Sequence, residues 1–275
     1  MKGELFHIFR NTPFGREIFL QSLYTCKTMG KKAKVLLPGF KQYLMYFEHA
    51  VVTLELDDSF LRARATAETH ARELAGQAGV DITFLEPREF TASTLPDLPI
   101  DFDIMTCPRS MKDMSSKVGL GYIGPRVRAL VRHAPFPVLI PAAVFKPFNS
   151  LVVFFGGSEY SRRALSVARE MAGKTHMPLS LFTVLENQDE AHYRRILEQE
   201  GLLAEIESGH IKWQLAGGQP LREAFYSVPH DALVVAGAFG HGVVRDIVFG
   251  SMLEQIQTIL PNNLLIVGPQ CVHLS

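Results

Sequence analysis

The sequence has few cysteines and no excess of charge of either sign. Only three of its 275 residues are cysteine, at positions 26, 107 and 271, and none forms a CxxC pair. This number and spacing argue against a disulfide framework and a zinc site, and they favour a reducing, cytoplasmic setting. Lysine and arginine number 28, as do aspartate and glutamate. No global field therefore attracts nucleic acid or an anionic membrane.

The sequence also lacks a hydrophobic run long enough to cross a bilayer. The longest run, at 135–145, is interrupted by prolines and falls short of the roughly 20 residues that a membrane helix needs. The first fifteen residues lack the apolar core of a signal peptide, because Arg10 and Asn11 interrupt it. The histidines show no spacing typical of metal ligands. We expect a cytoplasmic protein with no metal site and neither membrane nor nucleic acid as a partner.

Short apolar runs alternate with amphipathic stretches throughout the second half. The runs expected to form buried strands are 150–155, 178–186, 210–216, 231–237 and 262–268. The stretches expected to form helices are 158–173, 189–208, 220–228 and 251–260. Ser158 is expected to cap the first helix and Gly173 to end it. This alternation predicts a parallel sheet covered by helices on both faces.

The first half repeats this plan, with about twenty additional residues expected within 41–58. Its predicted strands are 6–9, 33–38, 81–87, 101–107 and 135–141, and its predicted helices are 15–30 and 59–79. Near their ends the two copies align at an offset of 126, which places Pro135 on Pro261. We predict an α/β protein of two tandem Rossmann-like domains, 1–145 and 149–275, each with a five-stranded parallel sheet flanked by helices. The short linker implies that the two domains pack on each other.

Three glycines and a serine follow the strand at 231–237 with the spacing Gly237, Gly240, Gly250 and Ser251. A loop at the carboxyl edge of a parallel sheet lies where open α/β folds bind ligands. The first two glycines are expected to adopt positive φ and turn their amides toward an anion. The last glycine and the serine open a helix whose free amides favour phosphate, with His241 and Arg245 as further donors.

Each of these residues also has a purely structural interpretation. Ser251 and Glu254 fit a capping box, and the glycines could serve turn geometry alone. His241 and Arg245 could be solvent-exposed side chains without a ligand.

The second half resembles a universal stress protein domain, and the whole chain resembles the tandem members of that family. The resemblance is carried by LVVFFGGSEYSRRAL, HDALVVAG, the glycine pattern and PNNLLIV. It implies five-stranded parallel sheets, pairing of the two domains through their last strands, and adenine nucleotide binding in members that carry the motif. The residues implied to bind the nucleotide are Phe154, Phe155, Gly156, Val184, Ala236, Gly237, Gly240, His241, Gly250, Ser251 and Met252.

Two departures from the family pattern affect this expectation. Members that bind ATP usually carry aspartate where this sequence has Gly156, so a charge-assisted hydrogen bond would be missing and affinity would fall about ten- to a hundredfold. Phe154 could stack on the base or could fill its pocket.

The first half carries none of the glycine pattern in register. Met111, Met114 and Pro125 stand where the second half has Gly237, Gly240 and Ser251, although Gly119 and Gly121 could slide into the loop. Arg10, Asn11 and Thr12 replace the Gly-Gly-Ser that follows the first strand of the second half. We therefore expect the first domain to have lost nucleotide binding.

The function expected is regulatory, in stress response, with ATP, ADP or AMP bound by the second domain and Mg²⁺ accompanying the phosphates. No paired carboxylate, P-loop lysine or general base stands beside the glycines, so no catalytic residue is predicted and ATP hydrolysis would be slow at most. The alternative is a structural or protein-interaction module with vestigial pockets. An enzyme of the adenylate-forming group would need a substrate-activating constellation, and none is visible. A homodimer is left open.

Overall fold

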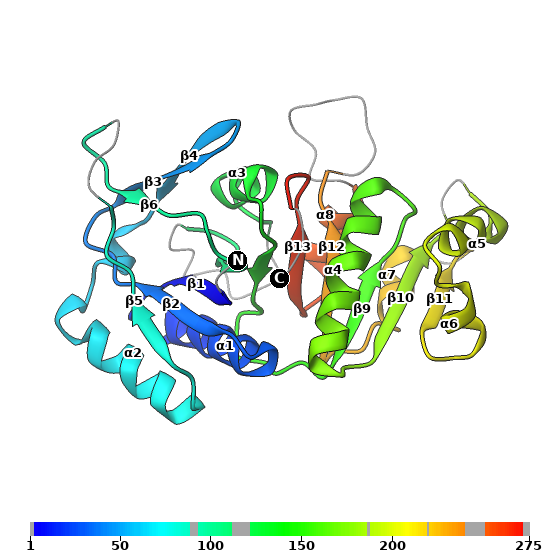
Figure 1. The fold of residues 1–275 in the computed structure, drawn as a ribbon, viewed down its shortest axis with the longest axis horizontal. Coiled ribbons are helices and arrows are strands. Elements are labelled where there is room, and N and C mark those ends of the chain that lie inside the picture. Colours follow the sequence, from blue (N-terminus) through cyan, green and yellow to red (C-terminus); the bar gives the residue numbers. More distant parts are fainter. Residues whose placement is uncertain are drawn as a thin grey trace.

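The computed structural model describes residues 3–88, 93–111, 122–185, 188–218, 220–239 and 251–271. The two halves of the chain share one sheet (Figure 1). The first half contributes β1 (Glu4–Ile8), β2 (Lys32–Leu36), β5 (Ile82–Phe84), β7 (Ile104–Thr106) and β8 (Val138–Ile140). The second contributes β9 (Ser150–Phe154), β10 (Leu179–Val184), β11 (Lys212–Ala216), β12 (Ala232–Gly237) and β13 (Asn263–Val267).

The ten strands lie in the order β11-β10-β9-β12-β13-β8-β7-β1-β2-β5. Within each half all neighbours are parallel, whereas β8 and β13 pair antiparallel, with Leu139 opposite Leu265. The predicted tandem Rossmann-like α/β fold is confirmed. It differs from two separate five-stranded sheets because the two last strands join them into one.

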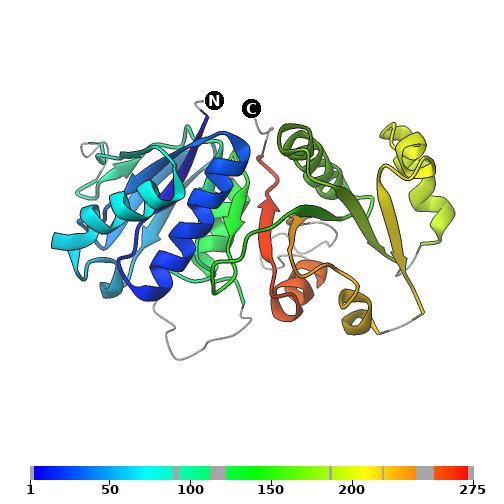
Figure 2. The same ribbon diagram turned by 90° about the horizontal axis from the view of Figure 1, so that it is seen from below.

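Helices cover both faces of the sheet (Figure 2). One face carries α1 (Pro13–Met29), α2 (Arg64–Ala78), α4 (Glu159–Thr175), α5 (Glu190–Gln199) and α6 (Leu203–Glu207). The other carries α3 (Pro125–His133), α7 (Leu221–Phe225) and α8 (Ser251–Ile259). Side chains alternate between the two faces along each strand, so neighbours such as Phe154 and Phe155 enter different cores.

The additional residues of the first half form a hairpin. Its strands β3 (Gln42–Phe47) and β4 (Ala50–Glu55) build a separate sheet with β6 (Asp97–Leu98), and a short 3-10 helix, η1 (Asp58–Phe60), follows. The β4 strand packs against α3. The hairpin therefore covers the face of the sheet on which α3 lies.

Local capping explains where several helices start and stop. Ser158 caps α4 as predicted, accepting a hydrogen bond from the Ser161 amide at 3.2 Å. The prediction that Gly173 ends this helix is wrong, because α4 continues to Thr175 and ends at left-handed His176. The predicted helix 189–208 is two helices, α5 and α6, because Gly201 adopts a φ of +71° between them.

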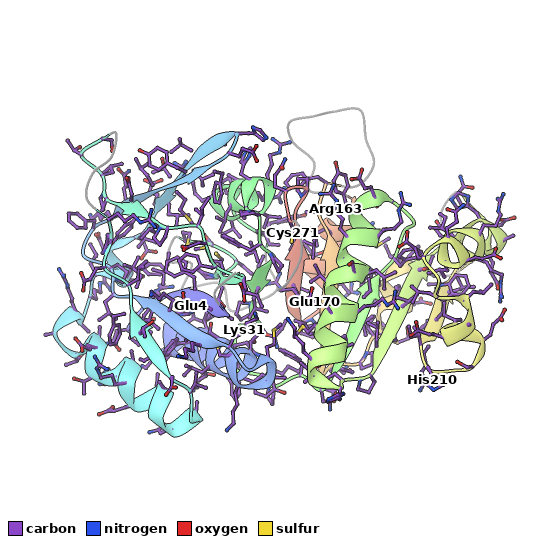
Figure 3. All side chains as sticks on the ribbon, in the orientation of Figure 1. Glu4, Lys31, Arg163, Glu170, His210 and Cys271 are labelled. Carbon is purple, nitrogen blue, oxygen red and sulfur yellow. The ribbon has the colours of Figure 1, made fainter. Side chains whose placement is uncertain are left out.

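The described ranges contain no helix that is long and apolar enough to cross a membrane, and no group of three or more His, Cys, Asp or Glu residues placed to hold a metal ion. All three cysteines are buried and free. Cys271 lies near Arg163 and Glu170 of α4 (Figure 3). Burial raises the pKa of its thiol to about 12, so the thiol is protonated at neutral pH.

Candidate functional site

The strand order reverses between β9 and β12 in the second half, and the region outside their carboxyl ends is called the switch point. From β9 the chain proceeds outward to β10 and β11, whereas β12 and β13 lie on the opposite side of β9. In open α/β sheets, ligands bind at such a reversal, outside the carboxyl ends of the strands. Phe154 ends β9 and is paired with Ala236, so the loops that follow β9 and β12 start side by side. These loops carry the predicted site residues from Gly156 and from Gly237 onward.

Gly156 leaves open space at the end of β9. It is exposed, and a Cβ added there would meet no heavy atom within 4 Å. Its φ lies outside the left-handed region, so any L-residue can adopt this backbone. A residue with a Cβ would therefore meet no obstruction at this position.

Gly237 has a different role from the one predicted. The predicted positive φ is wrong. A Cβ at this position would lie 2.4 Å from the carbonyl oxygen of Tyr160 in the first turn of α4. Glycine is required here because β12 approaches the backbone of α4 closely. The missing side chain of Gly237 therefore allows the end of β12 to lie against the first turn of α4.

Phe154 is a core residue. Its side chain is 6% exposed, and its ring centroid lies 4.9 Å from that of Phe182 and 5.3 Å from that of Phe225 in α7. Val184, the other apolar residue predicted to face the base, is partly buried against the same cluster. The edge-on contact with Phe225 is a favourable aromatic geometry, so the Phe154 ring is already committed to packing.

A chain of hydrogen bonds positions Phe155, the residue that follows β9 and precedes Gly156. The Trp213 indole donates to Thr183 Oγ1 at 3.0 Å, and the Thr183 hydroxyl donates to the carbonyl oxygen of Phe155 at 2.8 Å. The Phe155 amide in turn donates to the Phe182 carbonyl. This chain crosses three neighbouring strands. It could not be found from the sequence, because the strand order that brings Trp213 and Thr183 together is a long-range property.

The helix that follows β12 in the chain is α8. This helix begins at Ser251, and Leu253 and Ile256 hold it against the core. Met252 is partly buried against the same core. Gly240, His241, Arg245, Gly250 and the side chain of Ser251 lie outside the described residues. The structure thus brings together Phe155, Gly156, Ala236 and Gly237 at the ends of adjacent strands.

In the first half, side chains fill the loop that follows β1. The Arg10 guanidinium carbon lies 5.3 Å from the Phe60 ring centroid. The Asn11 amide nitrogen donates to the Ala63 carbonyl at 3.0 Å and to the Thr66 hydroxyl at 3.1 Å. Both side chains are buried. This loop is therefore closed by its own residues, whereas the corresponding loop of the second half is open at Gly156.

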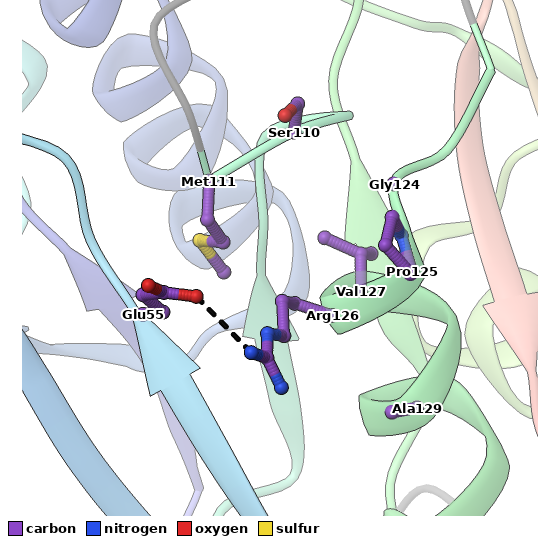
Figure 4. Close-up of a pocket in the computed structure, with 8 residues that line it drawn as sticks. All are labelled: Glu55, Ser110, Met111, Gly124, Pro125, Arg126, Val127 and Ala129. Carbon is purple, nitrogen blue, oxygen red and sulfur yellow. Dashed lines mark hydrogen bonds and ion pairs between the residues drawn. The ribbon is translucent and has the colours of Figure 1, made fainter.

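A cavity of about 320 Å³ lies between β4 and the start of α3 in the first half (Figure 4). Its lining residues are Glu55, Ser110, Met111, Gly124, Pro125, Arg126, Val127 and Ala129. Pro125 opens α3 and has no amide hydrogen to offer an anion. Glu55 of the hairpin accepts a hydrogen bond from Arg126 at 3.1 Å, so a carboxylate of the chain itself lies by the positive end of this helix. Met114, Gly119 and Gly121 are outside the described residues.

The strand order and the helices on both faces of the sheet define a tandem Rossmann-like protein. No family model matches the sequence. A curated universal stress protein of Synechocystis sp. is 25% identical over 199 residues, a match that spans 68% of this chain and 65% of that relative.

Solved structures resemble the chain over nearly its whole length. A universal stress protein from Archaeoglobus fulgidus matches with a TM-score of 0.66 and 16% identity, covering 98% of this chain and 99% of its own. A Pseudomonas aeruginosa protein provisionally assigned to the same family has a TM-score of 0.59 at 13% identity, covering 97% of this chain and 93% of its own. The predicted resemblance to tandem universal stress proteins is confirmed, in sequence over part of the chain and in fold over nearly all of it.

Proposed function

We propose that this chain is a regulatory protein of the universal stress type that binds one adenine nucleotide, ATP, ADP or AMP, in its second half. The observation that carries the proposal is the reversal of strand order between β9 and β12, with free space beside Gly156 at the end of β9 and with α8 starting after β12. Dipoles and free amides at helix starts favour phosphate at such a position.

Each part of the nucleotide has candidate residues at this switch point. The base would lie beside Gly156 and Val184, because the Phe154 and Phe155 rings are buried on opposite faces of the sheet. The ribose would lie near Ala236 and Gly237. The phosphates, with Mg²⁺ if it accompanies them, would be held by the segment of Gly240, His241, Gly250, Ser251 and Met252. Because Gly156 offers no carboxylate, we expect weaker binding than in members that carry aspartate.

We propose that the protein responds to whether a nucleotide is bound and does not need to hydrolyse it. Among the described residues of this edge, Phe155, Gly156, Ala236 and Gly237 supply no acid, base or nucleophile. A bound nucleotide would then act by favouring one conformation or one association state of the protein.

Calorimetric titration of the full chain with ATP tests the proposal. We expect one site per chain, since Arg10 and Asn11 close the corresponding loop of the first half. Two equivalent sites would contradict the assignment of binding to the second half alone. Absence of heat, of a thermal shift with millimolar ATP, and of nucleotide released by heating the purified protein would overturn the proposed function.

A substitution at Gly156 sharpens this test. Gly156→Asp restores the missing carboxylate at a position with free space and should tighten ATP binding about ten- to a hundredfold. Gly173→Asp is the matched control, because this position in α4 is also unobstructed and lies far along the helix from its start. Equal affinities for the two variants would place the base and ribose elsewhere.

A second candidate function is favoured by one observation, the packing of Phe154 between Phe182 and Phe225. In this alternative the aromatic cluster fills the base pocket, and the protein is an interaction module that binds no nucleotide. The expected result is then no response to ATP by either the unaltered chain or Gly156→Asp. A gain of ATP binding by Phe154→Val, with none by the unaltered chain, would identify the ring as the obstruction.

A further inference from the structure

The antiparallel junction of β8 and β13 places the last helix of each half beside the loops of the other. Because the strands of the two halves run in opposite directions, their carboxyl ends lie at opposite edges of the shared sheet. The α3 helix follows β7 and precedes β8, so it starts at the carboxyl edge of the first half and runs back along the sheet. Its last turn therefore lies at the edge where β12 and β13 end, next to Gly268.

A contact across the two halves occurs at this edge. Arg132, in the last turn of α3, places its guanidinium carbon 5.0 Å from the ring centroid of Phe239. Phe239 stands two residues after the end of β12 and directly precedes Gly240. This distance is typical of an attractive cation–π contact.

Phe239 has an unusual backbone. Its φ is +67°, in the left-handed region, which bulky aromatic residues rarely adopt. Such a conformation persists only where surrounding contacts impose it. The ring packs against the core as a partly buried side chain, and Arg132 contacts it from the other half. These side-chain contacts stabilise the bend at which the chain leaves β12.

The last turn of α3 is itself held rigidly. A Cβ on Gly268, directly after β13, would lie 1.8 Å from the carbonyl oxygen of Val131, so the backbones of the two halves are in contact next to Arg132. A reciprocal arrangement exists at the other edge. Arg109, which follows β7, donates to the Gln257 carbonyl of α8 at 2.8 Å, and the Ile123 amide donates to Gln257 Oε1 at 2.7 Å. Each last helix thus contacts residues that flank the long loop of the opposite half.

We propose that Arg132 of the first half is a positioning residue for the nucleotide site of the second half. It holds Phe239 in the left-handed conformation and so sets the direction in which the chain proceeds from β12 toward Gly240. This inference rests on the proposed function, and it gives the first half a role without a nucleotide of its own. Arg132 acts through Phe239 and not by contact with the nucleotide.

Calorimetric titration of full-length variants with ATP tests the inference. Arg132→Gln should weaken ATP binding about two- to fivefold, and Arg132→Lys should restore most of the affinity because an ammonium group also attracts a ring face. Arg126→Gln is the matched control, with the same charge change at the other end of α3, and it should leave the affinity unchanged.

Glycine at position 239 separates positioning from a general loss of stability. Phe239→Gly removes the ring and makes the left-handed φ easy to adopt. In that background Arg132→Gln should have no further effect on the affinity for ATP, whatever its effect on the melting temperature. The inference is overturned if Arg132→Gln matches the Arg126→Gln control, or if its effect persists undiminished in Phe239→Gly. If the unaltered chain binds no ATP, the proposed function fails first, which distinguishes the two failures.

Discussion

At the scale of single residues, the first half contains a buried polar cluster beneath α1. Ser22 links His7 Nδ1 and Thr106 Oγ1, each at 2.9 Å, and His7 Nε2 has no hydrogen-bond partner among the described residues. Burial lowers the pKa of His7 from 6.5 to about 3. The imidazole is therefore neutral in the folded protein at neutral and mildly acidic pH.

We predict that His7 makes the protein sensitive to acid. Between pH 6.5 and about 3 the unfolded chain binds a proton at His7 that the folded chain does not, so the free energy of unfolding falls as the pH is lowered, by at most about 1.4 kcal/mol per pH unit. Urea denaturation at pH 7, 6 and 5 measures this slope. His7→Gln should flatten it, whereas His210→Gln, exposed at the outer edge of the second half (Figure 3), should not. An identical slope for both variants would contradict the prediction.

A second residue-scale prediction concerns the buried ion pair between Lys31 and Asp103. Their side chains are 4% and 0% exposed. Lys31→Met would leave the Asp103 carboxylate buried without its cation and should lower the free energy of unfolding by about 3–5 kcal/mol. Adding Asp103→Asn should recover part of this loss, because the uncompensated charge is then gone.

The exposed pair Lys41–Asp58 is the control for that experiment. Its two side chains are 61% and 69% exposed, so water and salt screen the attraction. Lys41→Met should leave the urea midpoint almost unchanged. A comparable loss in Lys31→Met and Lys41→Met would show that burial of the pair does not matter.

Single residues also mark the limit of prediction from sequence. Ser158 was identifiable as a cap because capping depends on residues within one turn of the helix. The role of Gly237 could not be predicted, because the Tyr160 carbonyl oxygen that leaves no room for a Cβ belongs to another element, α4. Arg109, Arg132 and Gln257 carried no local signal at all. Their contacts exist only because the two halves meet, which no local pattern records.

At the scale of elements, the contact between α3 and the end of β13 depends on a missing side chain. The Cβ of an alanine at position 268 would overlap the Val131 carbonyl oxygen, so α3 would have to move away from the end of β13. We predict that Gly268→Ala lowers the free energy of unfolding by about 1–3 kcal/mol, measured by urea denaturation. Gly173→Ala, in open space within α4, should instead raise it by about 0.5–1 kcal/mol. Stabilisation by both changes would mean that α3 moves away at no cost.

Most strands and helices could be predicted because their patterns are local. Apolar runs ended by glycine or proline correspond to β9, β12 and β13, with differences of one or two residues at the ends. The prediction was less accurate where a helix is interrupted, as before α2, where Ala63 adopts a φ of 50° without a glycine to announce it. The hairpin of β3 and β4 is predicted only as additional residues, because its strands pair in a separate sheet and not with a strand of the main sheet.

At the scale of the whole molecule, each half covers the last strand of the other, because β8 and β13 pair along what would otherwise be two exposed sheet edges. The strand β13 is buried along its entire length, with β12 on one side and β8 on the other. We predict that the second half produced alone, as residues 147–275, self-associates through β13, because an exposed apolar edge strand pairs readily with a second copy. Light scattering over a range of concentrations measures this, and deuterium exchange should show protected amides at Leu264 to Ile266. A fragment that stays monomeric with these amides exchanging freely would contradict it.

Because β8 and β13 run antiparallel, each half of the chain contacts the other both along its last strand and at the end of its last helix. Removing the first half would therefore expose β13 and would also remove Val131 and Arg132 from beside Gly268 and Phe239 of the second half. A change in either half at these positions is expected to require a matching change in the other.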